Sequence, residues 1–166
     1  MRSCWLIIPL LLNVLFPNAG TSRAQAVAVS AAQDGAAQIT LANGEKISIQ
    51  KEAGQIGISA SQIAPDGTVG WLVEYKDESV SYPIVETLIT WRAGKIIRRF
   101  STGQSFYSWT FYTRGKQVAY HVGPLHGEVK SHCELHDVPS GRLLAVWEGD
   151  LESESNRPAW TKGLSH

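Results

Sequence analysis

The chain has 166 residues, and its 15 lysines and arginines are balanced by 15 aspartates and glutamates, so its formal net charge is zero. This length is sufficient for one domain with a substantial core. The absence of a basic excess argues against nucleic acid as a partner, because nucleic-acid binding requires a positively charged surface.

The segment 1–26 is typical of a secretory signal peptide. Arg2 provides a basic start, Cys4–Phe16 is apolar, and the Ala-Gln-Ala tripeptide 24–26 has the small-x-small pattern of a cleavage site. The apolar run is shorter than the roughly 20 residues that cross a bilayer, although an uncleaved N-terminal anchor remains the alternative. We therefore expect export to the periplasm or the extracellular space. The mature chain would begin near Val27 with 13 basic and 15 acidic residues, a net charge of −2, and no stable transmembrane segment.

The mature chain is predicted to be all-β. Residues 27–37 are small and alanine-rich, which indicates a flexible leader, and the β domain is expected over 38–149. Alternating apolar residues around Asn43-Gly44 predict an N-terminal hairpin. No helical periodicity is sustained, and turn residues recur throughout the chain. Residues 150–166 form a C-terminal tail, in which Trp160 could pack back onto a sheet.

An internal repeat determines the expected architecture. Gly67 and Gly115 each precede an apolar strand, and Gly94 aligns with Gly141 at nearly the same shift; Gly44 is the equivalent position in a third, partial copy. A period in the forties with four short strands is typical of propeller blades. We predict two four-stranded antiparallel blade-like units and the N-terminal hairpin, which together do not make a complete propeller. The expected strands lie near 38–42 and 45–50, then 58–63, 68–75, 85–91 and 95–100, then 106–112, 116–122, 131–137 and 142–148.

Two motifs carry a resemblance to a known family. The APDG turn at 64–67 and VPSGRLL at 138–144 resemble the WD40-like repeats of the TolB type found in exported bacterial proteins. Residues 58–148 are also similar to small exported bacterial proteins of unknown function that share a VGWL strand, a YP segment and a GRL ending. The resemblance implies an S/A-P-D-G turn between the first two strands of each blade. The second unit departs from this pattern, with Thr-Arg-Gly at 113–115.

So few blades leave hydrophobic faces that a neighbour must cover. The blades could pack on each other as a sandwich-like pair, several chains could complete a ring, or the hairpin and the tail could cover the outer faces. We expect a monomer in which the hairpin and the tail cap the pair, with a homo-oligomer as the alternative.

Residues 121–137 contain four of the five histidines. Alternation along a strand places His132, Glu134 and His136 on one face, where they could ligate zinc and leave a position for water. The Leu135 face resembles the core side, so an ordinary solvated polar hairpin, or a pH-responsive surface, explains the same pattern. Cys133 is the only cysteine after cleavage, which excludes an intramolecular disulfide. The candidate metal ligands are His121, His126, His132 and His136.

The loops 79–83 and 102–109 could expose some of the chain's aromatic residues. Most aromatic side chains of a β domain belong to its core, but exposed tyrosine and tryptophan mark partner surfaces. The candidate binding residues are Tyr82, Phe106, Tyr107 and Trp109.

No nucleophile elbow, P-loop or dinucleotide-binding motif occurs in the chain. We therefore expect an exported, non-enzymatic β-repeat protein that uses loops or a sheet edge to bind a protein or cell-envelope component. It would need no cofactor. The alternative is a small metal-binding protein or metal-dependent hydrolase that holds zinc in the hairpin 121–137.

Overall fold

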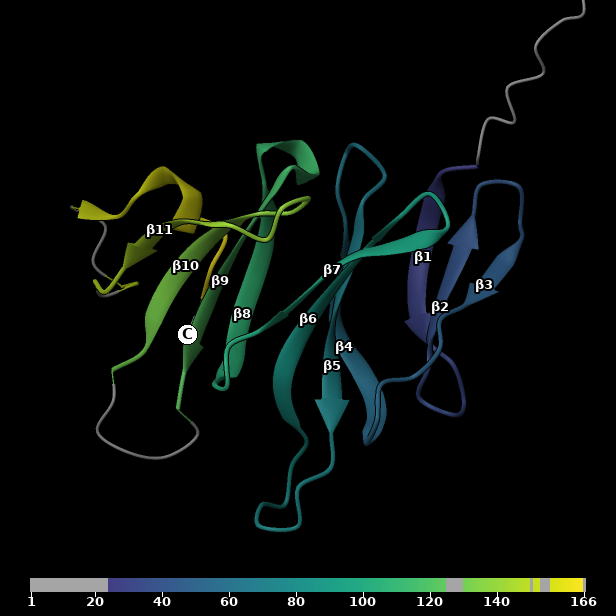
Figure 1. The fold of residues 1–166 in the computed structure, drawn as a ribbon, viewed down its shortest axis with the longest axis horizontal. Coiled ribbons are helices and arrows are strands. Elements are labelled where there is room, and N and C mark those ends of the chain that lie inside the picture. The colour runs from purple at the N-terminus through teal and green to yellow at the C-terminus, as the bar shows by residue number, and fades with distance from the viewer. Residues whose placement is uncertain (1–23, 125–129, 150, 153–155, 166) are drawn as a thin grey trace, which may run out of the picture.

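The structure is a computed structural model of the chain, and it describes residues 24–124, 130–149, 151–152 and 156–165. The strands form three antiparallel sheets that stand side by side (Figure 1). The N-terminal sheet contains β1 (Ala26–Ala31), β2 (Ala37–Leu41) and β3 (Lys46–Ser48). The central sheet contains β4 (Gln55–Ile63), β5 (Val69–Tyr75), β6 (Ile84–Arg92) and β7 (Lys95–Ser101). The C-terminal sheet contains β8 (Ser105–Tyr112), β9 (Gln117–Gly123), β10 (His132–Asp137) and β11 (Leu143–Trp147).

The prediction of two four-stranded units is confirmed. Each unit has its strands in sequential order, and the three sheets do not close into a propeller. The hairpin at Asn43-Gly44 is also confirmed: Gly44 has a φ of 84°, and its amide donates to Leu41 O at 2.9 Å. A glycine is favoured there because a positive φ costs it little.

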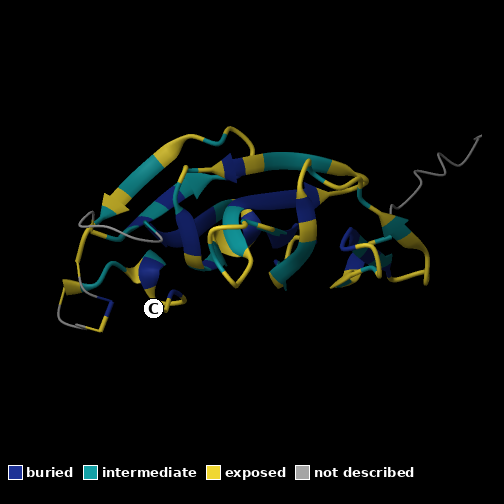
Figure 2. Ribbon diagram, turned by 90° about the horizontal axis from the view of Figure 1, so that it is seen from below, coloured by how far each residue is buried: buried dark blue, intermediate teal, exposed yellow. Residues whose placement is uncertain are grey.

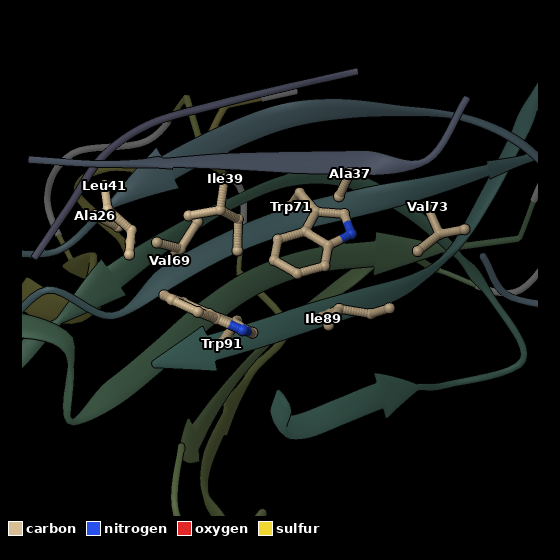
Figure 3. Packing of buried hydrophobic residues seen from close by; sticks show 9 residues of the cluster. All are labelled: Ala26, Ala37, Ile39, Leu41, Val69, Trp71, Val73, Ile89 and Trp91. Carbon is tan, nitrogen blue, oxygen red and sulfur yellow. The ribbon is translucent and has the colours of Figure 1, made fainter. Parts of the chain in front are cut away.

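The central sheet is apolar on both faces because another sheet covers each of them. Its Leu72, Leu88 and Phe100 pack against Phe106 and Tyr120 of the C-terminal sheet. On the opposite face, Trp71 and Trp91 lie against the N-terminal sheet (Figure 3). The residues drawn in that layer are Ala26, Ala37, Ile39, Leu41, Val69, Trp71, Val73, Ile89 and Trp91. Alternation along β5 and β6 distributes the large side chains between the two layers.

The two outer faces end the stack in different ways. The outer face of the N-terminal sheet is polar, with Gln38 beside Ser48 and Thr40 beside Lys46. The outer face of the C-terminal sheet is apolar, and the tail covers it. There Leu151, Leu164 and Trp160 pack over Ala119, Cys133 and Leu135, and a short 3-10 helix, η3 (Ala159–Thr161), carries the tryptophan. Figure 2 shows buried residues along the strands and exposed residues mainly in the turns. The predicted capping by hairpin and tail is thus observed.

The expected flexible leader over 27–37 is wrong. Residues 27–31 lie in β1, which pairs with β2 from Ala28↔Thr40 to Ala31↔Ala37, and Ala37 begins β2. Ala24 packs on the core and Ala26 is buried in it, so cleavage after residue 26 would remove packed residues. β1 contacts β4 of the central sheet, and composition does not show this tertiary neighbour. Among the described residues, no helix is long and apolar enough to cross a membrane.

Candidate functional site: an aromatic groove at one end of the sheets

A groove opens where the β5–β6 loop (residues 76–83) meets the start of β8. We call it the aromatic groove; its volume is about 250 Å³. A second hollow of about 280 Å³ adjoins it, and Tyr82 and Pro83 line both. The adjoining hollow extends past Ile56 and Lys76. The aromatic groove is lined by Tyr82, Pro83, Ile84, Val85, Ser105, Phe106 and Tyr107.

A β-bulge directs Tyr107 into the groove. Phe106 pairs with Val122 and Ser108 pairs with His121, so Tyr107 is the extra residue between them. Bulges redirect side chains and are common beside functional sites. The Tyr107 hydroxyl donates to Pro124 O at 2.6 Å. Its ring lies where a side chain on Gly123 would collide with it, since a Cβ there would be 2.8 Å from Tyr107 Cε2. The orientation of Tyr107 is thus set by the backbone and by its neighbours.

The groove combines a fixed base with exposed apolar walls. Phe106 is 5% exposed and meets the Tyr120 ring edge-on at 4.9 Å. Tyr82 and Tyr107 are 48% and 44% exposed, and Ile56 in the adjoining hollow is 46% exposed. Half-exposed tyrosines beside a rigid base offer contact area without a large loss of side-chain entropy on binding.

Ser105 adds an unused polar group to the lining. The residue is 5% exposed, and its Oγ has no hydrogen-bond partner among the described residues. An unpaired buried hydroxyl costs free energy, and a ligand would recover this cost only after rotation of the Ser105 side chain exposed the hydroxyl to the groove. The arrangement is therefore suited to recognition.

The structure brings together three of the four predicted aromatic residues, Tyr82, Phe106 and Tyr107. The fourth, Trp109, is 3% exposed, and its Nε1 donates to Ala60 O at 2.7 Å. Its ring fills the space beside Gly70, so it is a packing residue that joins β8 to the central sheet. The sequence did not predict three other lining residues, because nothing in their sequence context distinguishes a groove wall from a core position. They are Ile56, Val85 and Ser105.

The predicted histidine site is divided between two faces. Register pairs His132 with Val122 and Cys133 with His121, so His121 lies on the face opposite to His132 and His136. The expectation that the His132–His136 face is solvated is wrong: it points toward the central sheet, where Phe100 meets the His136 ring at 5.5 Å. The tail covers the Leu135 face, so both faces of β10 are protected. His126 lies outside the described residues.

Glu134 is the centre of a compact hydrogen-bond network. His132 Nε2 lies 2.9 Å from Oε1, and His136 Nε2 lies 2.6 Å from Oε2. Tyr120 donates to Oε2 at 2.9 Å. These hydrogen bonds, that of His136 first, hold the pKa of Glu134 at about 2 although burial acts to raise it. Burial and the nearby Glu134 charge together raise the pKa of Tyr120.

This network uses the histidine nitrogens that a metal would need. His136 Nδ1 lies 3.1 Å from Gly141 O, so both of its ring nitrogens already face oxygen acceptors. Burial raises the pKa of the Cys133 thiol to about 11, which disfavours the thiolate that metals bind. In the part of the chain that the structure describes, no group of three or more His, Cys, Asp or Glu residues is arranged to hold a metal ion.

No protein-family model matches the chain, and no curated protein matches it.

Proposed function

We propose that this chain is an exported, non-enzymatic β-repeat protein that binds a protein or cell-envelope partner at the aromatic groove. The observation that supports the proposal best is the convergence of Tyr82, Phe106 and Tyr107 on one groove, from two segments that are separated in the chain by β6 and β7. The Ser105 hydroxyl, buried and without a partner among the described residues, would add a polar contact after rotation of its side chain. The sequence resemblance to exported WD40-like repeats is in keeping with a binding role.

Site-directed photo-crosslinking tests this proposal in cells that export the protein. A photoreactive phenylalanine analogue replaces Tyr82 or Tyr107 in turn, and mass spectrometry identifies any adduct. We expect both positions to capture the same partner. Tyr107→Ala should reduce capture from position 82, because the two side chains line one groove.

Two further positions make the result decisive. Thr40, on the polar outer face, serves as the negative control. Val146 in β11 is 49% exposed on a strand at a sheet edge, and it tests docking by strand addition instead. Adducts at Val146 but not at Tyr82 or Tyr107 would move the partner to that edge. Equal capture at all four positions would show that the groove has no specificity.

We also propose that the protein acts as a monomer, because neither outer face of the stack of sheets leaves an apolar surface for a second chain to cover. A polar face ends one side and the tail ends the other. Light scattering of the purified protein should give the mass of one chain. A larger mass that matches a ring of blades would mean that several chains complete a propeller.

A further inference from the structure

A second groove lies at the opposite end of the central and C-terminal sheets. It forms where the β6–β7 turn meets the β8–β9 and β10–β11 turns, and its volume is about 430 Å³. Ile84 of the aromatic groove begins β6 and Arg92 of this second groove ends it. At the usual rise of a strand, the two sites are about 25 Å apart. They are therefore separate sites.

The base of this groove is apolar and its rim is cationic. Ile97, Val138 and Pro139 line it together with Arg92, Lys95 and Lys116. Val138 is 1% exposed, whereas the three cationic residues are exposed. We call the site the cationic groove.

Only part of this positive charge is neutralised within the protein. Arg92 pairs with Asp66 at 2.7 Å. Asp137, the one carboxylate among the described lining residues, accepts hydrogen bonds from the amide and the hydroxyl of Ser140. Lys95 and Lys116 make no side-chain hydrogen bond or ion pair with any described residue.

Two more arginines add positive charge nearby. The charges of Arg142 and Arg98 help to hold the pKa of Asp137 below its usual value, after the hydrogen bonds from Ser140. Arg98 also donates to the carbonyl of Pro139 in the groove wall. The potential in the groove therefore favours an anion, and its apolar base favours an uncharged hydrocarbon group.

We propose that the cationic groove binds a small organic anion, a carboxylate attached to an apolar body. The hydrocarbon part would cover Ile97, Val138 and Pro139, and the carboxylate would lie between Lys95 and Lys116. The volume falls within the usual range of small-molecule sites, about 300–1,000 Å³. An inorganic anion would leave the apolar base uncovered, and a neutral hydrocarbon would leave both lysines unpaired. This site is independent of the partner proposed for the aromatic groove.

Three small molecules separate the contribution of the apolar base from that of the two lysines. The purified protein is titrated with hexanoate, acetate and hexanol, and binding is followed by NMR shifts of the backbone amides of Ala93, Lys116 and Val138. We expect saturable binding of hexanoate, with acetate and hexanol each about tenfold weaker or more, since each lacks one of the two interactions. Hexanoate that binds no tighter than acetate, or that shifts no groove amide, would overturn the proposal.

Charge variants test the position of the carboxylate. Lys95→Gln and Lys116→Gln should each weaken hexanoate binding by about two- to fivefold, as expected for a partly exposed ion pair. Lys46→Gln is the matched control, because Lys46 is an exposed lysine on the outer face of the N-terminal sheet. An equal loss in the control would mean that only overall charge matters, and would refute a specific site.

A further titration with peptides identifies the source of the carboxylate. A tripeptide that ends in leucine is compared with the same peptide amidated at its C-terminus. Tighter binding than hexanoate by the free acid alone would indicate that the groove reads a peptide C-terminus. Binding no tighter than hexanoate would indicate a free organic acid.

Discussion

The central and C-terminal sheets have the same number and order of strands, but different elements cover their faces. Both contain four antiparallel strands, and their turn glycines recur with one period, Gly67 with Gly115 and Gly94 with Gly141. The central sheet is covered on each face by another sheet, and both layers are apolar. The C-terminal sheet has the Glu134 network on its inner face and the tail on its outer face. A repeat with two neighbours can be uniformly apolar, whereas a terminal repeat needs its own capping elements.

The corresponding turns of the two sheets differ as well. In the central sheet, Asp66 Oδ1 accepts the Thr68 amide at 2.9 Å, and Gly67 has a φ of 81°. In the C-terminal sheet the turn is a 3-10 helix, η1 (Thr113–Gly115), in which Arg114 has a φ of 58°. Where the second unit has Thr-Arg-Gly in place of Pro-Asp-Gly, a 3-10 helix thus replaces the turn of the first unit. One turn places a glycine in the left-handed region, and the other also places non-glycine residues there.

The largest expected effect is the loss of stability when a tryptophan between two sheets is removed. Trp71→Ala, at a residue only 1% exposed, should lower the free energy of unfolding by about 3–5 kcal/mol. Trp147→Ala, beneath the tail, should cost less because Trp147 is only partly buried. Urea denaturation of both variants measures the difference. Equal losses would show that the tail interface is as tightly packed as the sheet interface.

The polar network should make the C-terminal sheet sensitive to acid. The Glu134 pKa is lowered from 4.5 to about 2, so its stabilising contribution is complete above pH 4.5 and is lost as the pH falls toward 2. Because the carboxylate is partly solvated, we expect Glu134→Gln to cost about 1–3 kcal/mol at pH 7. The variant and the natural protein should have similar stability near pH 2. A cost that does not change with pH would mean that packing, and not ionisation, stabilises the network.

The tail should open without unfolding the central sheet. The Arg157 guanidinium donates to the carbonyls of Leu151, at 2.9 Å, Leu164, at 2.6 Å, and Thr161. Arg157→Lys cannot satisfy these acceptors with the same geometry, which should weaken tail closure by about 1–2 kcal/mol. Cys133 is buried beneath the tail, so its labelling by a thiol reagent should accelerate about 5- to 30-fold.

Mass spectrometry would assign the labelled cysteine, and urea denaturation would follow the central sheet. If labelling accelerates only as much as global unfolding does, the tail is not an independent cap.

Turn glycines and alternation were sufficient to predict the strands from β2 onward, but not β1 and not the environment of each face. Gly67 and Gly115 marked equivalent turns, because a positive φ is a local requirement visible in sequence. Alternation correctly grouped His132 with His136, but it could not show that both faces of β10 are covered. The bulge at Tyr107 depends on the pairing of two strands, which is a property of neither sequence segment alone. Of the four aromatic residues predicted from the sequence, Tyr82, Phe106 and Tyr107 lie together in one groove, whereas Trp109 is buried in the packing between two sheets.

The smallest expected effect concerns the two turns. Arg114→Gly should stabilise the protein by about 0.5 kcal/mol, because relief of left-handed strain slightly exceeds the entropy cost of a flexible glycine. The reverse change in the central sheet, Gly67→Ala, should destabilise it by about 1 kcal/mol. A Cβ at Gly67 would also lie 3.3 Å from Gln25 Cγ, so that side chain must move. Arg114→Ala separates the side chain from the backbone and should leave stability nearly unchanged. If Arg114→Ala and Arg114→Gly destabilise equally, the arginine side chain, rather than the turn conformation, distinguishes the two repeats.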